Sequence, residues 1–213
     1  MLKLPKAYLS YSQLRVWLED KRAYRNRYYL GLESPPSRAL LFGSEIADAL
    51  EKGTAVLPSL VTYPVREHQI KIDVEGVPFF AWIDTYWPEK RKFREYKTGQ
   101  LTREGKDRWT QKEVDAHLQL DVYSTLIEEK EGHVDPECHL DWLEVKRKKK
   151  TFTDWLGNVI ETETADLELT GRVESFARVI TEMERRRTRA LIRSVAEEIS
   201  ADYAAFLKAA ETP

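Results

Sequence analysis

Hydrophobic and polar residues alternate near the middle of the chain in a pattern that predicts two paired strands. Residues 79–87 are rich in aromatic and β-branched side chains, which strands favour. Residues 88–91 form a polar segment that opens with proline, as turns often do. Residues 92–98 return as a second strand, and a glycine follows. The stretch therefore predicts a β-hairpin with a four-residue loop.

The length of that loop decides which side chains face each other across the hairpin. Trp87 then pairs with Lys92, and Asp84 lies directly opposite Glu95. The Cβ atoms of such neighbours lie roughly 4.5–5.5 Å apart, so two carboxylates repel each other unless a cation lies between them. Lys97 projects from the same face as Glu95. The pattern indicates either a solvated, charge-rich hairpin or a site for a hard divalent cation.

Helical and alternating patterns predict further elements on both sides of the hairpin. Helices are expected over residues 10–30, 39–52, 110–130 and 181–208, strands over 65–74, 138–145 and 167–180, and a short hairpin over 151–163. The helix over 110–130 carries an apolar residue at every fourth position. Gln119 and Tyr123 lie beside that stripe and share a face, which predicts either a hydrogen-bonded pair at the core boundary or part of a site.

Composition limits the class of protein. The chain has 213 residues, of which 42% are hydrophobic, and this suffices for a single domain. We divide it into an N-terminal helix and loop (1–38), a core (39–150) and a C-terminal hairpin, strand and helix (151–213). The 34 Lys and Arg residues against 36 Asp and Glu give a net charge of −2, so the chain has no overall basic field.

The single cysteine, Cys138, excludes an internal disulfide and a four-cysteine iron–sulfur or zinc site built by this chain alone. We therefore expect a cytoplasmic protein without an iron–sulfur cluster. No run of about 18 apolar residues is present and the N-terminus lacks a signal-peptide pattern, so no membrane partner is expected.

Basic residues are nevertheless clustered in three tracts. The candidates for contact with a nucleic-acid backbone are Arg22, Arg25, Lys146, Arg147, Lys148, Arg186 and Arg187. Solvated basic faces are the alternative for all three tracts, and for the two helical tracts they are the default interpretation. The arginines of residues 185–193 lie near the predicted start of a helix, where cations oppose the helix dipole, and this placement suggests an external anion.

Five short motifs occur in a fixed order along the chain. They are YLSYSQL (residues 8–14), FGS with ALE (42–44 and 49–51), Ile83-Asp84, EYKTG (95–99) and a Gln119…Tyr123 pair. The set resembles the PD-(D/E)XK nuclease superfamily, and within it the RecB-type exonuclease branch, which includes CRISPR-associated RecB-like and phage exonucleases. The similarity spans about two thirds of the chain, over residues 8–145. It implies an α/β fold with a restriction-endonuclease-like core, in which helices flank a mixed central sheet of four strands.

The resemblance also implies roles for the hairpin residues. Asp84 and Glu95 would bind Mg²⁺ or Mn²⁺, with the backbone carbonyl of Tyr96 as a third oxygen ligand. Lys97 would position the attacking water and offset charge in the transition state. The facing helix would supply the residues that orient Lys97 or the DNA strand, namely Gln119 and Tyr123.

One departure from the family pattern concerns the first core helix. A histidine that ligates the metal in the family falls at Ala47 here. Glu51, one turn away on the same face, is a candidate substitute, and Asp48 is the second choice, whereas Glu45 points away. A structural role for Glu51 is the alternative.

These observations predict a metal-dependent DNA nuclease, in particular an exonuclease, acting in repair, recombination, phage or CRISPR-type DNA processing. A helicase or another DNA-processing protein is a candidate partner. The alternatives are a catalytically silent DNA-binding module on the same fold and an interaction protein that binds no nucleic acid.

Overall fold

A mixed sheet of five strands, in the order β1-β2-β3-β4-β5, forms the centre of the fold. The computed structural model describes residues 2–33, 35–54, 57–102 and 104–211. The strands are β1 (Val65–Val74), β2 (Val77–Trp87), β3 (Lys92–Gly99), β4 (Glu137–Thr153) and β5 (Val159–Val179). Strands β3 and β4 are parallel, and the other neighbours are antiparallel. The predicted α/β class is confirmed, but the prediction of four strands is wrong because β5 is a full member of the sheet.

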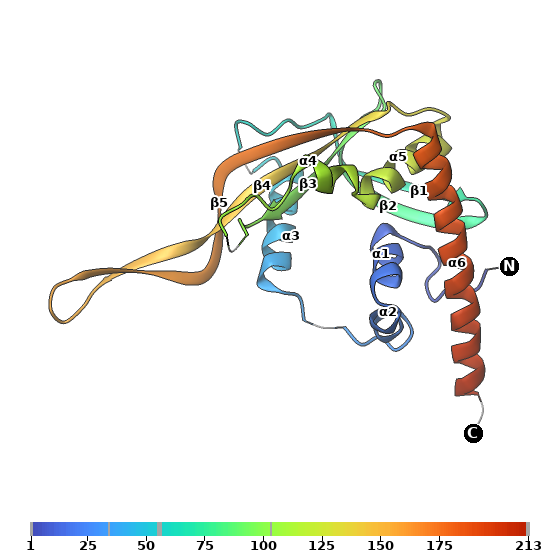
Figure 1. Cartoon of the computed structure of the whole chain (residues 1–213), viewed down its shortest axis with the longest axis horizontal. Helices are drawn as coiled ribbons and strands as arrows, with labels where there is room; N and C mark the ends of the chain where they lie inside the picture. Colours follow the sequence, from blue (N-terminus) through green and yellow to red (C-terminus); the bar gives the residue numbers. More distant parts are fainter. Residues whose placement is uncertain (1, 34, 55–56, 103, 212–213) are drawn as a thin grey trace.

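Within the described residues, six helices accompany the sheet (Figure 1). They are α1 (Tyr11–Glu19), α2 (Lys21–Tyr28), α3 (Arg38–Glu51), α4 (Gln111–Asp115), α5 (Leu118–Glu131) and α6 (Glu182–Ala210). The single helix expected over 10–30 is two helices, because Asp20 adopts an extended backbone and its carboxylate accepts hydrogen bonds from the first amides of α2. The helix expected over 110–130 is likewise divided, at the extended residue His117.

The main hydrophobic core lies where α1, α5 and α6 pack with the sheet. Ile70 of β1, Ile83 of β2 and Phe93 of β3 are fully buried there, together with Leu126 of α5. Burial of each such side chain contributes about 1.5–3 kcal/mol. The tight turn between β1 and β2 holds Gly76 at a φ of +78°, a conformation that glycine adopts without steric cost. This core fixes the positions of the first three strands, which carry the candidate site.

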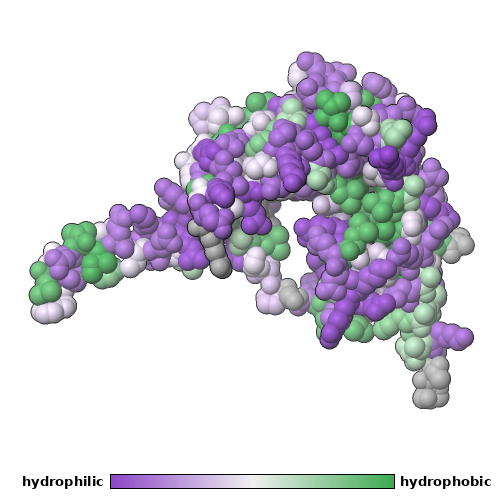
Figure 2. Space-filling view, in the orientation of Figure 1, coloured by the Kyte–Doolittle hydropathy of each residue, from purple (hydrophilic) through white to green (hydrophobic). Residues whose placement is uncertain are grey.

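The ends of β4 and β5 project from the body as a two-stranded arm (Figure 1). Residues 146–150 lie inside β4, so the strand expected over 138–145 continues through the basic tract, and the short hairpin expected over 151–163 is only the tip of the arm. Ion pairs cross the arm from Lys146 to Glu168 and from Lys149 to Glu161. The tip exposes apolar side chains, among them Trp155, which is 90% exposed (Figure 2).

In the part of the chain that the structure describes, no helix combines the length and the apolar character that crossing a bilayer requires.

Candidate active site

The β2–β3 hairpin has the predicted register. Trp87 pairs with Lys92, and the ladder continues to the pair of Thr85 and Arg94. Beyond this pair, the Oδ2 atom of Asp84 accepts a hydrogen bond from the backbone N–H of Tyr96 at 2.5 Å. The side chain of Asp84 therefore accepts from the backbone of β3. This hydrogen bond holds its carboxylate next to β3, beside Glu95.

Glu95 is the most deeply buried carboxylate of this site, with 3% of its surface exposed. Its Oε1 atom accepts hydrogen bonds from Lys97 Nζ and from Gln119 Nε2, both at 2.7 Å. Its Oε2 atom is buried and has no hydrogen-bond partner among the described residues. A buried carboxylate oxygen without a partner costs free energy, so this atom is suited to a cationic ligand.

The helix α5 supplies the amide that holds Glu95. Gln119 Nε2 also donates to the hydroxyl of Tyr123 at 2.8 Å, so the two residues form the hydrogen-bonded pair that their spacing indicated. The amide of Gln119 contacts Glu95, whose Oε1 atom also accepts from Lys97. That the pair orients Lys97 or the DNA strand stays a prediction.

The charges of these residues strongly affect one another. Burial, together with the negative charge of Glu95, raises the pKa of Asp84 well above its usual range. Burial alone would lower the pKa of Lys97, but the charges of Glu95 and Asp84 outweigh this effect and raise it. The site therefore favours the charged form of Lys97 and disfavours the charged form of Asp84.

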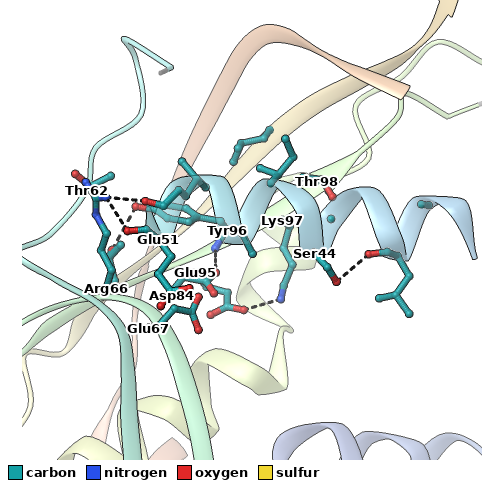
Figure 3. Close-up of a pocket in the computed structure, with 18 of the residues that line it drawn as sticks. Ser44, Glu51, Thr62, Arg66, Glu67, Asp84, Glu95, Tyr96, Lys97 and Thr98 are labelled. Atoms are coloured by element: carbon teal, nitrogen blue, oxygen red, sulfur yellow. Dashed lines mark hydrogen bonds and ion pairs between the residues drawn. The ribbon is translucent and has the colours of Figure 1, made fainter. Parts of the chain in front are cut away.

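These side chains line an open pocket of about 710 Å³ (Figure 3). One wall is the helix α3, which lies close to β3 because Gly43 has no side chain: a Cβ atom there would lie 3.2 Å from Thr98 Oγ1. Ala47 and Glu51 of the same helix also line the pocket. The helix position at which the resemblance places a histidine thus faces the site, although alanine occupies it.

Several pocket residues were not predicted from the sequence. They are Arg15 of α1, Glu67 of β1, and Arg108 and Trp109 of the segment before α4. Glu67 had a recognisable signal, since the turn at residues 75–76 sets the β1–β2 register and places Glu67 opposite Asp84. The segment before α4 had none, because nothing in a polar loop indicates where it folds back.

The predicted nucleic-acid contacts are distributed over three separate regions, and all of them are exposed. Three already have acidic partners: Arg25 with Asp202, Lys146 with Glu168, and Arg186 with Glu182. Their role in binding DNA stays a prediction, as it does for Arg22, Arg147, Lys148 and Arg187.

A divalent cation suits the donors of the pocket, which are carboxylates, one of which, Glu95, has a buried, unpartnered oxygen. Within the described residues, no group of three or more His, Cys, Asp or Glu side chains is already arranged as a complete metal site. Side-chain rotation would therefore have to accompany binding.

The sequence matches no protein-family profile and no curated protein. Among the solved structures with a similar fold are the following two. A phage-related exonuclease from Haemophilus somnus 129PT is 11% identical with a TM-score of 0.54, and the alignment covers 87% of this chain and 81% of that protein. A protein from Eubacterium rectale, provisionally named an exonuclease, is 13% identical with a TM-score of 0.50, and the alignment covers 90% and 82% of the two chains. At these identities the comparison establishes the shared fold.

Proposed function

We propose that this protein is a metal-dependent DNA nuclease of the PD-(D/E)XK type, related to the RecB-like exonucleases. The observation that carries the proposal is the unpartnered Oε2 atom of Glu95, buried next to Asp84 and within the same pocket as Lys97. The fold shared with two proteins named as exonucleases supports the same activity. An excess of buried negative charge beside one lysine is what binding of Mg²⁺ or Mn²⁺ requires.

Asp84 and Glu95 would hold the ion, and the Tyr96 carbonyl and Glu51 are further candidate ligands. When bound, the ion would lower the pKa of a water molecule and offset the charge that develops on the phosphate. Gln119 and Lys97 both hold the Oε1 atom of Glu95, which leaves Oε2 as its free coordinating atom.

Lys97 acts as a hydrogen-bond donor in this proposal. Its raised pKa keeps the ammonium group charged at neutral pH, so it is unsuited to accept a proton from water. It would instead donate to a phosphate oxygen or to the attacking water while the phosphate enters the pocket. The basic tracts would hold the DNA backbone outside the pocket, which makes the affinity salt-dependent.

The test is cleavage of end-labelled linear DNA and of circular DNA, with Mg²⁺, with Mn²⁺ and with EDTA. We expect metal-dependent cleavage by the wild-type protein and its loss in Lys97→Ala. Cleavage of linear but not circular DNA would identify an exonuclease. Equal cleavage by the wild type and Lys97→Ala would refute the role of the lysine.

A second candidate function is a catalytically silent DNA-binding module. The observation that favours it is Ala47, which lines the pocket where the related nucleases carry a metal ligand. Salt-sensitive DNA binding without cleavage in either metal would support this function.

A further inference from the structure

Glu67 of β1 lines the same pocket as the two predicted metal ligands. The ladder between β1 and β2 pairs Arg66 with Thr85 and His68 with Ile83, so the same register places Glu67 opposite Asp84. Glu67, Asp84 and Glu95 therefore come from three adjacent strands and line one pocket. Figure 3 shows their carboxylates directed toward the same part of that pocket.

The position of Glu67 is energetically costly. Its φ is +47°, a left-handed conformation that is rare for a glutamate within a strand. Its carboxylate is half-buried near Glu51 and Glu95, whose negative charges oppose its own. No hydrogen bond or ion pair to the carboxylate of Glu67 is formed within the described residues. Because no protein group offsets the strain, burial and repulsion at Glu67, its carboxylate is suited to a ligand from outside the chain.

The neighbouring Glu95 gives independent evidence for such a ligand. Glu95 lines the pocket with only 3% of its surface exposed, and its buried Oε2 atom has no hydrogen-bond partner among the described residues. Ala47 of α3 and Glu67 of β1 line the same pocket. The methyl group of Ala47 offers no donor to a cation, whereas Glu67 offers a carboxylate.

We propose that Glu67 is a third carboxylate ligand of the divalent cation and replaces the ligand missing at Ala47. The inference rests on the proposed function, because it concerns the same ion as Asp84 and Glu95. It differs from the expectation for Glu51, which lies at the C-terminal end of α3 and is exposed. In this arrangement the three ligands come from β1, β2 and β3, and α3 supplies none.

Isothermal titration of the full chain with Mn²⁺ tests the inference without relying on activity. We expect Glu67→Gln, which keeps the shape and removes the charge, to weaken binding roughly 10- to 100-fold. Glu51→Gln tests the competing candidate ligand on α3, and this inference expects it to keep the wild-type affinity. The matched control is Glu75→Gln, since Glu75 is an exposed glutamate of the β1–β2 turn that also has a positive φ, of +53°.

Thermal unfolding without metal provides a second readout. Glu67→Asn removes one methylene and suits a left-handed backbone, so it should raise the Tm of the metal-free protein while lowering the rise in Tm that Mn²⁺ produces. Glu75→Asn should relieve its own backbone in a similar way and leave the response to Mn²⁺ unchanged.

The outcomes separate this inference from the proposed function. Wild-type affinity in Glu67→Gln, with weaker binding in Asp84→Asn, would overturn the role of Glu67 alone. Weaker binding in Glu51→Gln but not in Glu67→Gln would assign the third ligand to α3 instead. A wild-type protein that binds no Mn²⁺ and cleaves no DNA would overturn both.

Discussion

Two buried carboxylates on neighbouring strands differ in how completely their oxygens are hydrogen-bonded. Asp141 of β4 is 1% exposed, and its two oxygens accept hydrogen bonds from Arg94 Nη1 at 2.8 and 2.9 Å. Glu95 of β3 is nearly as buried, but only one of its oxygens has a partner. A buried charge is stable when its partner is part of the fold, and an incompletely paired one indicates a place for a ligand. Residues 94 and 95 thus contribute to structure and site, respectively.

Two arginines of α6 are paired within the fold, as Arg94 is with Asp141. Arg185 donates to Glu128 at 2.9 Å, and Arg189 is hydrogen-bonded to Glu128 and Glu129 of the same helix, α5. The sequence suggested that arginines near the start of this helix meet an external anion. For these two residues the anions are internal, since carboxylates of α5 neutralise them.

The largest predicted effect is the loss of cleavage in Glu95→Gln. The substitution removes the charge that would hold the cation, so the metal-dependent rate should fall about 10³-fold or more, which corresponds to ~4 kcal/mol. The free energy of unfolding without metal should change little, because relief of the repulsion with Asp84 offsets the loss of the ion pair with Lys97. The measurements are cleavage kinetics in Mg²⁺ and urea unfolding in EDTA. Strong destabilisation would show that the charge of Glu95 serves the fold.

The next effect concerns Asp141→Asn. It leaves Arg94 buried without its counter-charge, so the free energy of unfolding should fall by about 3 kcal/mol. The Mn²⁺ affinity of the folded protein should not change. As a control, the double variant Arg94→Met with Asp141→Leu removes both charges and should recover most of the loss. A weaker metal affinity in Asp141→Asn would erase the distinction between the two carboxylates.

A smaller effect is expected for Gln119→Met, which removes the amide that holds Glu95 at 2.7 Å. The loss of a hydrogen bond to a charged group should lower the cleavage rate roughly 10- to 30-fold, or ~1.5–2 kcal/mol. Tyr123→Phe keeps the ring and removes only the hydroxyl that accepts from Gln119, so its effect should be weaker. Equal losses in both variants would indicate that the pair acts as one unit.

The smallest effect is a pH dependence of stability that originates next to the pocket. Burial, with the charges of Lys97 and Arg178 nearby, lowers the pKa of His117 from 6.5 to about 4. The unfolded chain then binds more protons than the folded one between these values, so this residue should reduce stability by about 1–2 kcal/mol as the pH falls from 7 to 5. Urea unfolding of the wild type and of His117→Gln at both pH values gives the measurement. The same pH dependence in both proteins would exclude His117 as its source.

Local patterns predicted the hairpin register because loop length alone sets which residues pair. They failed at the two helix breaks. Asp20 fits the polar side of a continuous helix, and so does His117, so periodicity does not distinguish a helix from two helices joined at an extended residue. The arm was misjudged for a related reason: residues 146–150 are charged on both faces, and strands are recognised by an apolar face.

The positions of Asp84, Glu95 and Lys97 were determined by the sequence itself, because they depend on a turn, alternation and a spacing of two residues. The role of Glu67 depends on tertiary structure. The turn at residues 75–76 indicates only which residue of β2 lies across from Glu67. Its place in the site follows from the pairing of β2 with β3 and from the position of α3. The same is true of Arg94 and Glu95, which are adjacent and equally polar in sequence. Asp141 of β4 pairs with Arg94, whereas Gln119 of α5 reaches only one oxygen of Glu95. The tertiary structure decided this difference, because electrostatic interactions act through space and not along the chain.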